Sequence, residues 1–226
     1  MFAKHIFSRT LLITVAVCAA ATFWVAGWME KHPLPSSGGL YFPGEILLSG
    51  PHFLQSDPKW GTDTLGPTGD PLATVGCAVA SAAMVLAGYG IDTDPGQLNA
   101  FLNATKGGYT PGGWIYWEKA AEVNPAYTAK LLPHYEDKPS YFLIDSNLLQ
   151  GNPVIIRLRK PDGATHFLVI CGKRGWDYLV RDPAGSGTKG VSPLKEIGGP
   201  IEALRFYRKP KGFPPPKPTQ VTSGRP

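Results

Sequence analysis

Residues 74–89 read TVGCAVASAAMVLAGY. From Ala78 to Tyr89 this run is rich in small residues and apolar on nearly every side, which is typical of a helix that is buried all round. Gly88 or Gly90 can end it, because glycine readily adopts the conformations found just after a helix. We therefore predict a buried helix over 78–89 with Cys77 immediately before it.

The rest of the globular region divides into a helical half and a strand half. Asp94 can cap a helix that starts at Pro95, and further helices are predicted over 114–123 and 140–150. The hydrophobic period then changes to that of strands, predicted over 153–158, 166–171, 178–181 and 201–207 and separated by Gly-containing turns. The order predicts an α+β fold with an N-terminal helical half and a C-terminal antiparallel sheet.

The length of 226 residues allows one ordinary domain with extensions, and 43% hydrophobic residues can form a core without disulfides. We expect the domain at 51–208. It follows a stalk at 29–50 rich in Pro, Gly and Ser, and precedes a disordered, basic, Pro-rich tail at 209–226. Residues 10–28 are predicted as a membrane anchor or signal peptide, with a cytoplasmic N-terminus at 1–9.

The N-terminal apolar run, Leu11 to Trp28, holds 18 residues without a charge. This length just suffices to cross a bilayer as a helix. Lys4 and Arg9 precede the run, which favours a cytoplasmic N-terminus and an exported body. The alternative is a signal peptide cleaved near the alanines at 19–21. Both interpretations place the body outside the cytoplasm, either tethered to the membrane or secreted.

The net charge of +5 resides in the C-terminal tail. The tail from Phe206 onward has five basic residues and no acidic residue, so the remainder of the chain is close to neutral. A neutral body with a basic tail does not predict a nucleic-acid partner. No Cys/His cluster has metal-ligand spacing and no Gly-rich phosphate loop is present, so neither a metal nor a cofactor is expected.

Cys77 is the candidate nucleophile. A thiol at a helix N-terminus faces unsatisfied N–H groups and the positive end of the helix dipole, and both favour the reactive thiolate. Two alternatives remain open. Cys77 could be a small buried core residue, as most free cysteines are, or it could form a disulfide with Cys171 in an exported protein.

His166 and Asp182 are the candidate partners of the thiol. A hairpin through Gly172 to Asp177 would make the strands 166–171 and 178–181 antiparallel neighbours, so that the start of one lies beside the end of the other. The carboxylate could then hold one imidazole nitrogen while the other faces the thiol. Alternatively, His166 bonds a turn and Asp182 merely begins one.

The disulfide and the catalytic arrangement exclude each other. Cys171 lies five residues beyond His166, roughly 16 Å along an extended strand and on the opposite face. If His166 contacts Cys77, then Cys171 lies too far from Cys77 to form a disulfide with it.

Gln55 is the candidate oxyanion donor. Attack by a thiolate builds negative charge on the carbonyl oxygen of the substrate, and a side-chain amide together with the N–H of the nucleophile can receive it. Alternatively, Gln55 is a polar residue in a surface loop.

These residues lie in motifs that resemble the free-standing members of the double-glycine, or bacteriocin-processing, peptidase family. The resemblance covers about residues 51–207, through QSDPKWG at 55–61, GCAVASAAMVL at 76–86, GGY at 107–109, HFLV at 166–169 and DPA at 182–184. It implies a papain-like cysteine peptidase fold in a bacterial protein. By position it makes Cys77 the nucleophile, His166 the base, Asp182 the residue that orients the base and Gln55 the oxyanion donor.

The best-known members of that family are fused to peptide-exporting ATP-binding-cassette transporters and cut leader peptides after Gly-Gly in the cytoplasm. This sequence has no transporter segment and carries its own apolar run, so the substrate is left open. We expect a membrane-tethered cysteine peptidase that acts on peptides or proteins. The alternatives are a cell-wall amidase or endopeptidase of the CHAP type on the same scaffold, and a non-catalytic peptide-binding module.

Overall fold

The computed structural model describes residues 14–21, 33–125, 132–136, 138–160, 162–185 and 190–209. The chain divides into two compact units, Met1–Pro33 and Leu34–Pro226, and each is treated by itself. The second unit contains the sheet, the hydrophobic core and every candidate site residue.

The predicted helices are present in the second unit with one shortened. The helix α3 spans Cys77–Gly88, α4 spans Pro95–Ala104 and α7 spans Tyr141–Leu149. The Asp94 side chain caps α4 by accepting from the Gln97 N–H at 2.8 Å, as expected. Short helices not foreseen are η1 at Gly66–Thr68, α2 at Leu72–Val75 and α8 at Leu194–Ile197.

The helix predicted over 114–123 is α5 and spans only Trp117–Ala121. Residues 109–116 form a tight loop instead, in which the backbone of Tyr109 bridges to Ile115. The Thr110 N–H donates to the Trp114 carbonyl at 2.8 Å. Gly113 has φ of +79°, a value that does not continue into a helix. The helix can therefore begin only after Tyr116.

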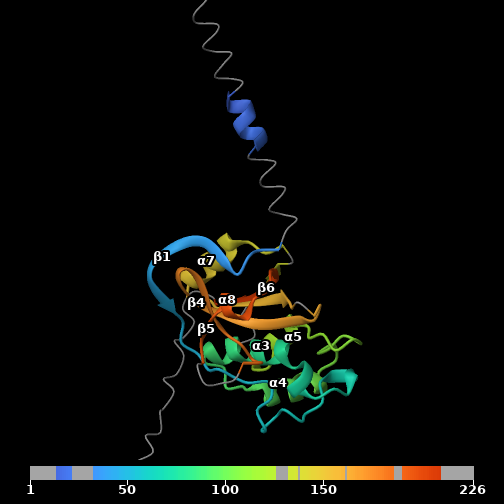
Figure 1. The fold of residues 1–226 in the computed structure, drawn as a ribbon. Coiled ribbons are helices and arrows are strands. Elements are labelled where there is room, and N and C mark those ends of the chain that lie inside the picture. The colour runs from blue at the N-terminus through green and yellow to red at the C-terminus, as the bar shows by residue number, and fades with distance from the viewer. Residues whose placement is uncertain are drawn as a thin grey trace, which may run out of the picture. The chain divides into compact units, whose positions relative to one another are not determined.

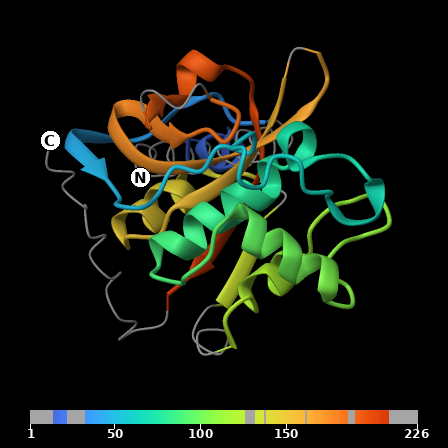
Figure 2. The same ribbon diagram turned by 90° about the horizontal axis from the view of Figure 1, so that it is seen from below.

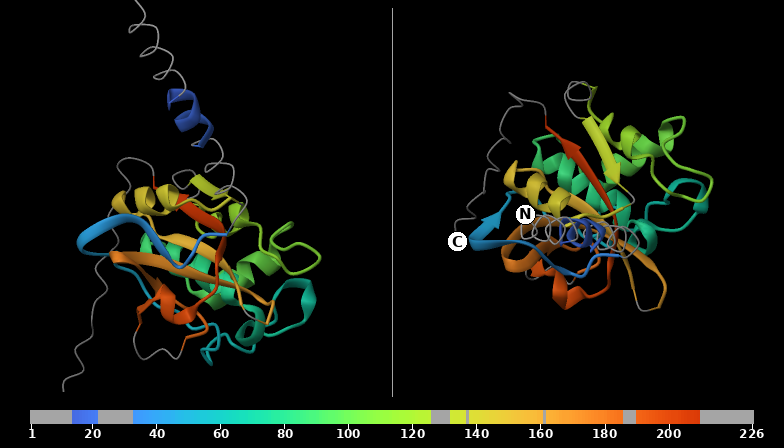
Figure 3. Two further views of the ribbon diagram at one scale, coloured as in Figure 1. Left: turned by 45° about the horizontal axis from the view of Figure 1, so that its top comes forward. Right: turned by 90° about the horizontal axis from the view of Figure 1, so that it is seen from above.

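The sheet has six antiparallel strands in the order β1-β4-β3-β6-β2, with β5 paired to β4. The two views of Figure 3 show β1 beside β4 and β2 beside β6. The α+β class predicted from the sequence is confirmed. The strands are β1 at Ser37–Leu47, β2 at Leu132–Glu136, β3 at Val154–Arg159, β4 at Thr165–Arg181, β5 at Ser192–Pro193 and β6 at Ile201–Arg208.

Helices cover both faces of the sheet. Figures 1 and 2 show α3, α4 and α5 on one face, and Figure 1 shows α7 on the other. Two apolar clusters follow from this layering, because alternate residues of each strand point to opposite faces. Ile155, Phe167 and Val169 pack with α3. Ile156, Leu168 and their neighbours pack with α7 and α8.

Strand β4 folds back on itself. A straight strand of 17 residues would span roughly 55 Å, yet its first residues lie against its last. The Cys171 thiol approaches the Leu179 carbonyl at 3.5 Å, and Gly175 turns the chain with φ of +59°. The expected hairpin through 172–177 is therefore present, although the backbone stays extended through most of the turn.

Part of the segment that we expected to form a stalk at 29–50 belongs to the second compact unit, which begins at Leu34. Strand β1 forms the edge of the sheet and pairs with β4. The Lys173 side chain is fully buried beneath it and donates to the Gly38 carbonyl and to Asp145, each at 2.7 Å. Gly39 lets the backbone pass, because a Cβ there would lie 2.3 Å from the Asp145 carboxylate. A buried ammonium group needs hydrogen-bond acceptors. Through the Gly38 carbonyl and Asp145, Lys173 therefore holds β1 against the rest of the domain.

The predicted membrane run at 10–28 and the predicted tail at 209–226 lie mostly outside the described residues. Of the run, residues 14–21 are helical. No helix within the described parts of the chain reaches the length and apolar character that a bilayer crossing requires.

Candidate active site

Cys77 is the first residue of α3, and its half-buried thiol lies in the wall of a cleft. Gly76 separates α2 from α3. A Cβ on this glycine would lie 2.5 Å from the Leu72 carbonyl oxygen. Gly76 therefore lets the last turn of α2 close, and its own N–H donates to the Leu72 carbonyl at 2.8 Å.

His166 and Asp182 are brought together by the fold of β4. His166 is the second residue of the strand and Asp182 follows its last residue, and His166 Nε2 lies 2.6 Å from Asp182 Oδ1. The imidazole is buried, while the carboxylate side chain is 18% exposed. The Ala184 N–H donates to the same carboxylate oxygen at 2.9 Å and so fixes its direction.

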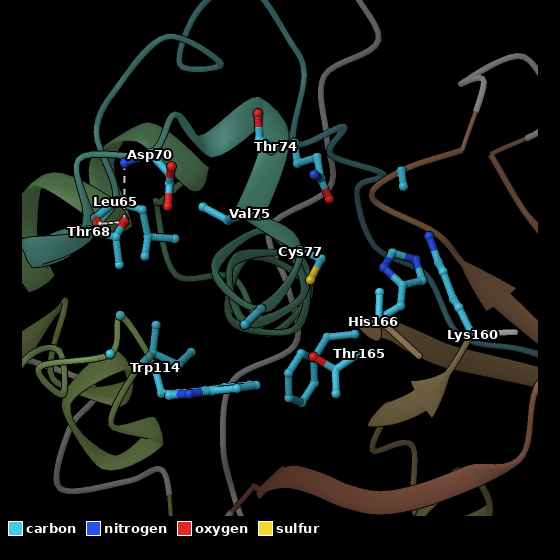
Figure 4. A pocket seen from close by; sticks show the side chains of 18 residues that line it. Leu65, Thr68, Asp70, Thr74, Val75, Cys77, Trp114, Lys160, Thr165 and His166 are labelled. Carbon is cyan, nitrogen blue, oxygen red and sulfur yellow. Dashed lines mark hydrogen bonds between the residues drawn. The ribbon is translucent and has the colours of Figure 1, made fainter. Parts of the chain in front are cut away.

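The Nδ1 atom of His166 is left for the thiol, because Nε2 is bonded to Asp182. Figure 4 shows the sulfur of Cys77 and the ring of His166 facing each other across the cleft. Burial favours the neutral imidazole, but hydrogen bonds to Asp182 and Cys77, with the charges of both, raise the pKa of His166 to about 9. The ring is therefore an imidazolium at neutral pH.

The carboxylate of Asp182 stays ionised beside this ring. Burial alone would raise the pKa of Asp182, but the hydrogen bond and charge of His166 outweigh it. The Ala184 N–H and the charge of Lys160 act in the same direction, and together these groups lower the pKa of Asp182.

Gln55 is buried in the wall of the same cleft as Cys77 and His166. Its Nε2 donates one proton to the Ala73 carbonyl at 2.8 Å, and its backbone N–H donates to the Pro183 carbonyl at 2.9 Å. The side-chain amide has a second proton, which this bond does not use. Of the four residues selected from the sequence, Gln55, Cys77 and His166 therefore line one cleft, and Asp182 contacts the imidazole of His166.

His52 and Lys160 were missed as parts of this site. His52 Nε2 donates to the Asp182 carbonyl at 2.8 Å, since a carbonyl can only accept. The side chain of Lys160 lies in the cleft wall (Figure 4). No local sequence signal predicts the contact of His52, because it joins residues 130 positions apart in the chain.

His52 holds the backbone of Asp182, so we predict a modest loss of activity when this hydrogen bond is removed. His52→Ala is expected to lower kcat/KM by about 3- to 10-fold, which corresponds to the usual net free energy of one hydrogen bond. His52→Gln keeps an N–H donor and is expected to recover most of that loss. Steady-state kinetics on both variants checks this, and equal losses in the two would contradict a role that depends on the donor.

The cleft has a volume of about 520 Å³ and lies between the helical half and the sheet. Its helical side includes Val75, Cys77 and Trp114, and its sheet side includes Thr165 and His166 (Figure 4). An elongated substrate can thus contact both halves. In the described parts of the chain, no group of three or more His, Cys, Asp or Glu side chains is placed to hold a metal ion.

The alternative disulfide between Cys77 and Cys171 is wrong, because both are free thiols. Cys171 is completely buried and does not line the cleft, and burial raises the pKa of its thiol to about 11. Of these two thiols, only Cys77 reaches the cleft.

Comparison with protein families gives a match to the Peptidase_C39-like family over residues 51–197. Two solved structures are similar. A protein described as a C39-like peptidase from Bacillus anthracis has 18% identity and a TM-score of 0.45, covering 74% of this chain and all of that one. The peptidase domain of Streptococcus ComA, a bifunctional ABC transporter of a quorum-sensing pathway, has 22% identity and a TM-score of 0.44, covering 65% of this chain and 98% of that one.

Comparison with the curated proteins gives no match. The family match covers well over half of the chain. All four residues singled out from the sequence, Gln55, Cys77, His166 and Asp182, lie within it. The chain therefore belongs to the Peptidase_C39-like family and is a cysteine-type peptidase.

Proposed function

We propose that this protein hydrolyses peptide bonds with Cys77 as nucleophile, His166 as acid and base, Asp182 as the group that orients His166, and Gln55 as an oxyanion donor. The observation that carries the proposal is the arrangement in one cleft of a thiol at the start of α3 and an imidazole whose far nitrogen is held by a carboxylate. The family match supports peptide hydrolysis as the reaction.

In the first half of the reaction the Cys77 thiol has already given its proton to His166 Nδ1, so that a thiolate stands beside an imidazolium. The Cys77 sulfur then attacks the carbonyl carbon of the substrate. The carbonyl oxygen gains the negative charge, which the free N–H of the Gln55 amide and the backbone N–H of Cys77 can receive. As the C–N bond breaks, the imidazolium gives its proton to the leaving amine, and a thioester remains on Cys77.

In the second half a water molecule attacks the thioester. His166, now neutral, accepts a proton from that water, and the same donors receive the charge on the oxygen again. The C–S bond breaks, the carboxylic acid leaves, and the Cys77 thiolate and the His166 imidazolium are restored. Asp182 keeps the ring oriented and stabilises its positive charge in both halves.

A direct test compares two substrate classes. The full chain is incubated with a pool of unstructured peptides and, separately, with purified peptidoglycan fragments, and the products are identified by mass spectrometry. We expect cleavage of the peptides and no change in the peptidoglycan. Release of wall fragments with the peptide pool intact would favour the cell-wall amidase instead.

Gln55 gives a prediction about the oxyanion. Gln55→Ala is expected to lower kcat by about 10²- to 10³-fold, as the loss of one oxyanion donor does in other acyl transfers. KM should change little, because the donor acts mainly in the transition state. Gln55→Glu removes the N–H donor at nearly constant size and should show a similar loss, whereas near wild-type kcat in both variants would contradict the role.

We also propose that the body is tethered at the outer face of the membrane. The support is the uncharged run from Leu11 to Trp28 with Lys4 and Arg9 before it. We expect the full-length protein in the membrane fraction, with its body degraded by protease added from outside the cytoplasmic membrane. A body that remains protected until that membrane is lysed would contradict this orientation, and a shortened protein in the soluble fraction would indicate signal cleavage.

A further inference from the structure

Two charged side chains besides the catalytic residues line the cleft, and they come from different halves of the domain. Asp70 lies in the loop after η1, on the helical side, and Lys160 lies in the turn between β3 and β4. Figure 4 shows them on opposite sides of Cys77, with the ring of His166 between the sulfur and Lys160. A substrate that reaches across the cleft therefore meets charges of opposite sign at different positions.

Neither of these charges is paired within the described residues. The Asp70 carboxylate and the Lys160 ammonium make no salt bridge and no side-chain hydrogen bond there. The charge of Lys160 helps to lower the pKa of Asp182, but that carboxylate already accepts from the Ala184 N–H and is bonded to His166. Unpaired charges in a substrate cleft select partners of complementary charge.

Backbone hydrogen bonds hold both residues in place before a substrate binds. The Asp70 N–H donates to Thr68 Oγ1 at 3.2 Å, and the Asp70 carbonyl accepts from the Leu65 N–H at 2.8 Å. The Lys160 N–H donates to the Ala164 carbonyl at 2.9 Å and closes the turn between β3 and β4. A fixed backbone reduces the conformational entropy that binding costs.

The chemistry of the cleft assigns the Lys160 charge to one part of the substrate. His166 protonates the leaving amine, so the part of the substrate beyond the cut bond leaves on the side of the ring. Lys160 lies on this side (Figure 4). We propose that Lys160 binds an anionic group in the leaving part of the substrate and that Asp70 binds a cationic group at a separate position. The inference rests on the proposed peptidase function and adds a substrate class, namely peptides that carry both charges.

Each charged group has two sources in a peptide, and the test separates them. The anion is an acidic side chain or a free C-terminus, and the cation is a basic side chain or a free N-terminus. The full chain first digests a peptide pool, and mass spectrometry counts the residues around each cut to locate the two positions. Matched peptides then carry Glu or Gln at the first position and Lys or Gln at the second, with their ends free or blocked.

We expect each charged group to raise kcat/KM over its neutral counterpart by about 5-fold or more, starting from the upper end of the range for exposed ion pairs. Both preferences should shrink in about 0.5 M salt, which screens exposed charges. Equal rates for charged and neutral peptides, whichever the source of the charge, would overturn the two subsites while peptide hydrolysis stands.

Each variant is judged by the ratio of kcat/KM for charged and neutral peptides, in which a general loss of rate cancels. Lys160→Gln should abolish the preference for the anion and keep that for the cation, and Asp70→Asn should do the reverse. Lys195→Gln is a further control, because Lys195 pairs with Asp177 and does not line the cleft. It should keep both preferences.

The same ratios distinguish substrate binding from an indirect role of Lys160 through Asp182. If Lys160 only supported the ionised carboxylate of Asp182, Lys160→Gln would slow every peptide equally and leave the preference for the anion intact. That result would overturn the Lys160 subsite. If no peptide is cut and Cys77 reacts with iodoacetamide no faster than a buried thiol, the peptidase function itself fails and both subsites fail with it.

Binding to the Cys77→Ala protein gives a readout without turnover. Fluorescence anisotropy should show a lower Kd for the Glu peptide than for the Gln peptide, by about 5-fold. This difference should vanish when Lys160→Gln is added to Cys77→Ala and persist when Lys195→Gln is added instead. An equal Kd for the two peptides in the Cys77→Ala protein would count against the anion subsite.

Discussion

Replacing Cys77 with alanine is expected to lower peptide hydrolysis by about 10⁴-fold or more, because the covalent route through the thioester is lost. The residue lies half-buried at the mouth of the cleft and α3 keeps its other contacts. Its removal should therefore change the free energy of unfolding by less than about 1 kcal/mol. Initial rates on a quenched fluorescent peptide, together with denaturant unfolding, measure both quantities.

Cys171→Ala is the matched control for this prediction. The thiol is fully buried and lies far along β4 from His166, so its loss should cost roughly 1 kcal/mol of stability by leaving a small cavity. Activity should stay within a few-fold of the wild type. An active Cys77→Ala protein, or a folded but inactive Cys171→Ala protein, would contradict the assignment of the nucleophile.

Asp182→Asn is expected to lower kcat/KM by about 10²- to 10⁴-fold, the range for loss of effective acid–base catalysis. In the wild type the pKa of His166 is raised to about 9, mainly by hydrogen bonds to Asp182 and Cys77 that outweigh burial. The imidazolium, which protonates the leaving amine, is thus present at neutral pH and is lost as the pH rises through 9. Activity of the wild type should fall above that pH.

The asparagine variant removes the negative charge that favours the imidazolium. Its alkaline limb should therefore move to lower pH, in addition to the loss of rate. Asp177→Asn is a suitable control, because Asp177 pairs with Lys195 at the exposed turn of β4. It should leave the pH–rate profile unchanged. An alkaline limb that stays in place in the Asp182→Asn protein would contradict the pairing of Asp182 with His166.

The parts of the fold that depend on local signals were predictable from the sequence. The apolar run after Cys77 has no polar face, so it could only be a buried helix, and it is α3. The apolar stretches on either side of Gly175 could only pair as a hairpin, and this pairing placed His166 beside Asp182. The meeting of these two side chains follows from strand register alone.

The parts that depend on tertiary contacts were not predictable. Nothing in the composition of 29–50 indicates that β1 would pair with β4, because the partner that binds it, the buried Lys173, lies far along the chain. The contact of His52 with the Asp182 carbonyl joins residues 130 positions apart. The loop that shortens α5 is set by long-range packing of Gly113 against Leu65 and Thr68, which the helical pattern of 114–123 does not reveal.

The most direct test of the account is the rate at which iodoacetamide alkylates each cysteine of the native full chain, mapped by mass spectrometry at pH 7. We predict that Cys77 reacts at least about 100-fold faster than Cys171, whose thiol is buried with a raised pKa. His166→Ala should slow the reaction of Cys77 markedly, because the imidazolium that stabilises the thiolate is gone. A Cys77 that reacts as slowly as Cys171, or at the same rate with and without His166, would contradict a thiolate–imidazolium pair in this cleft.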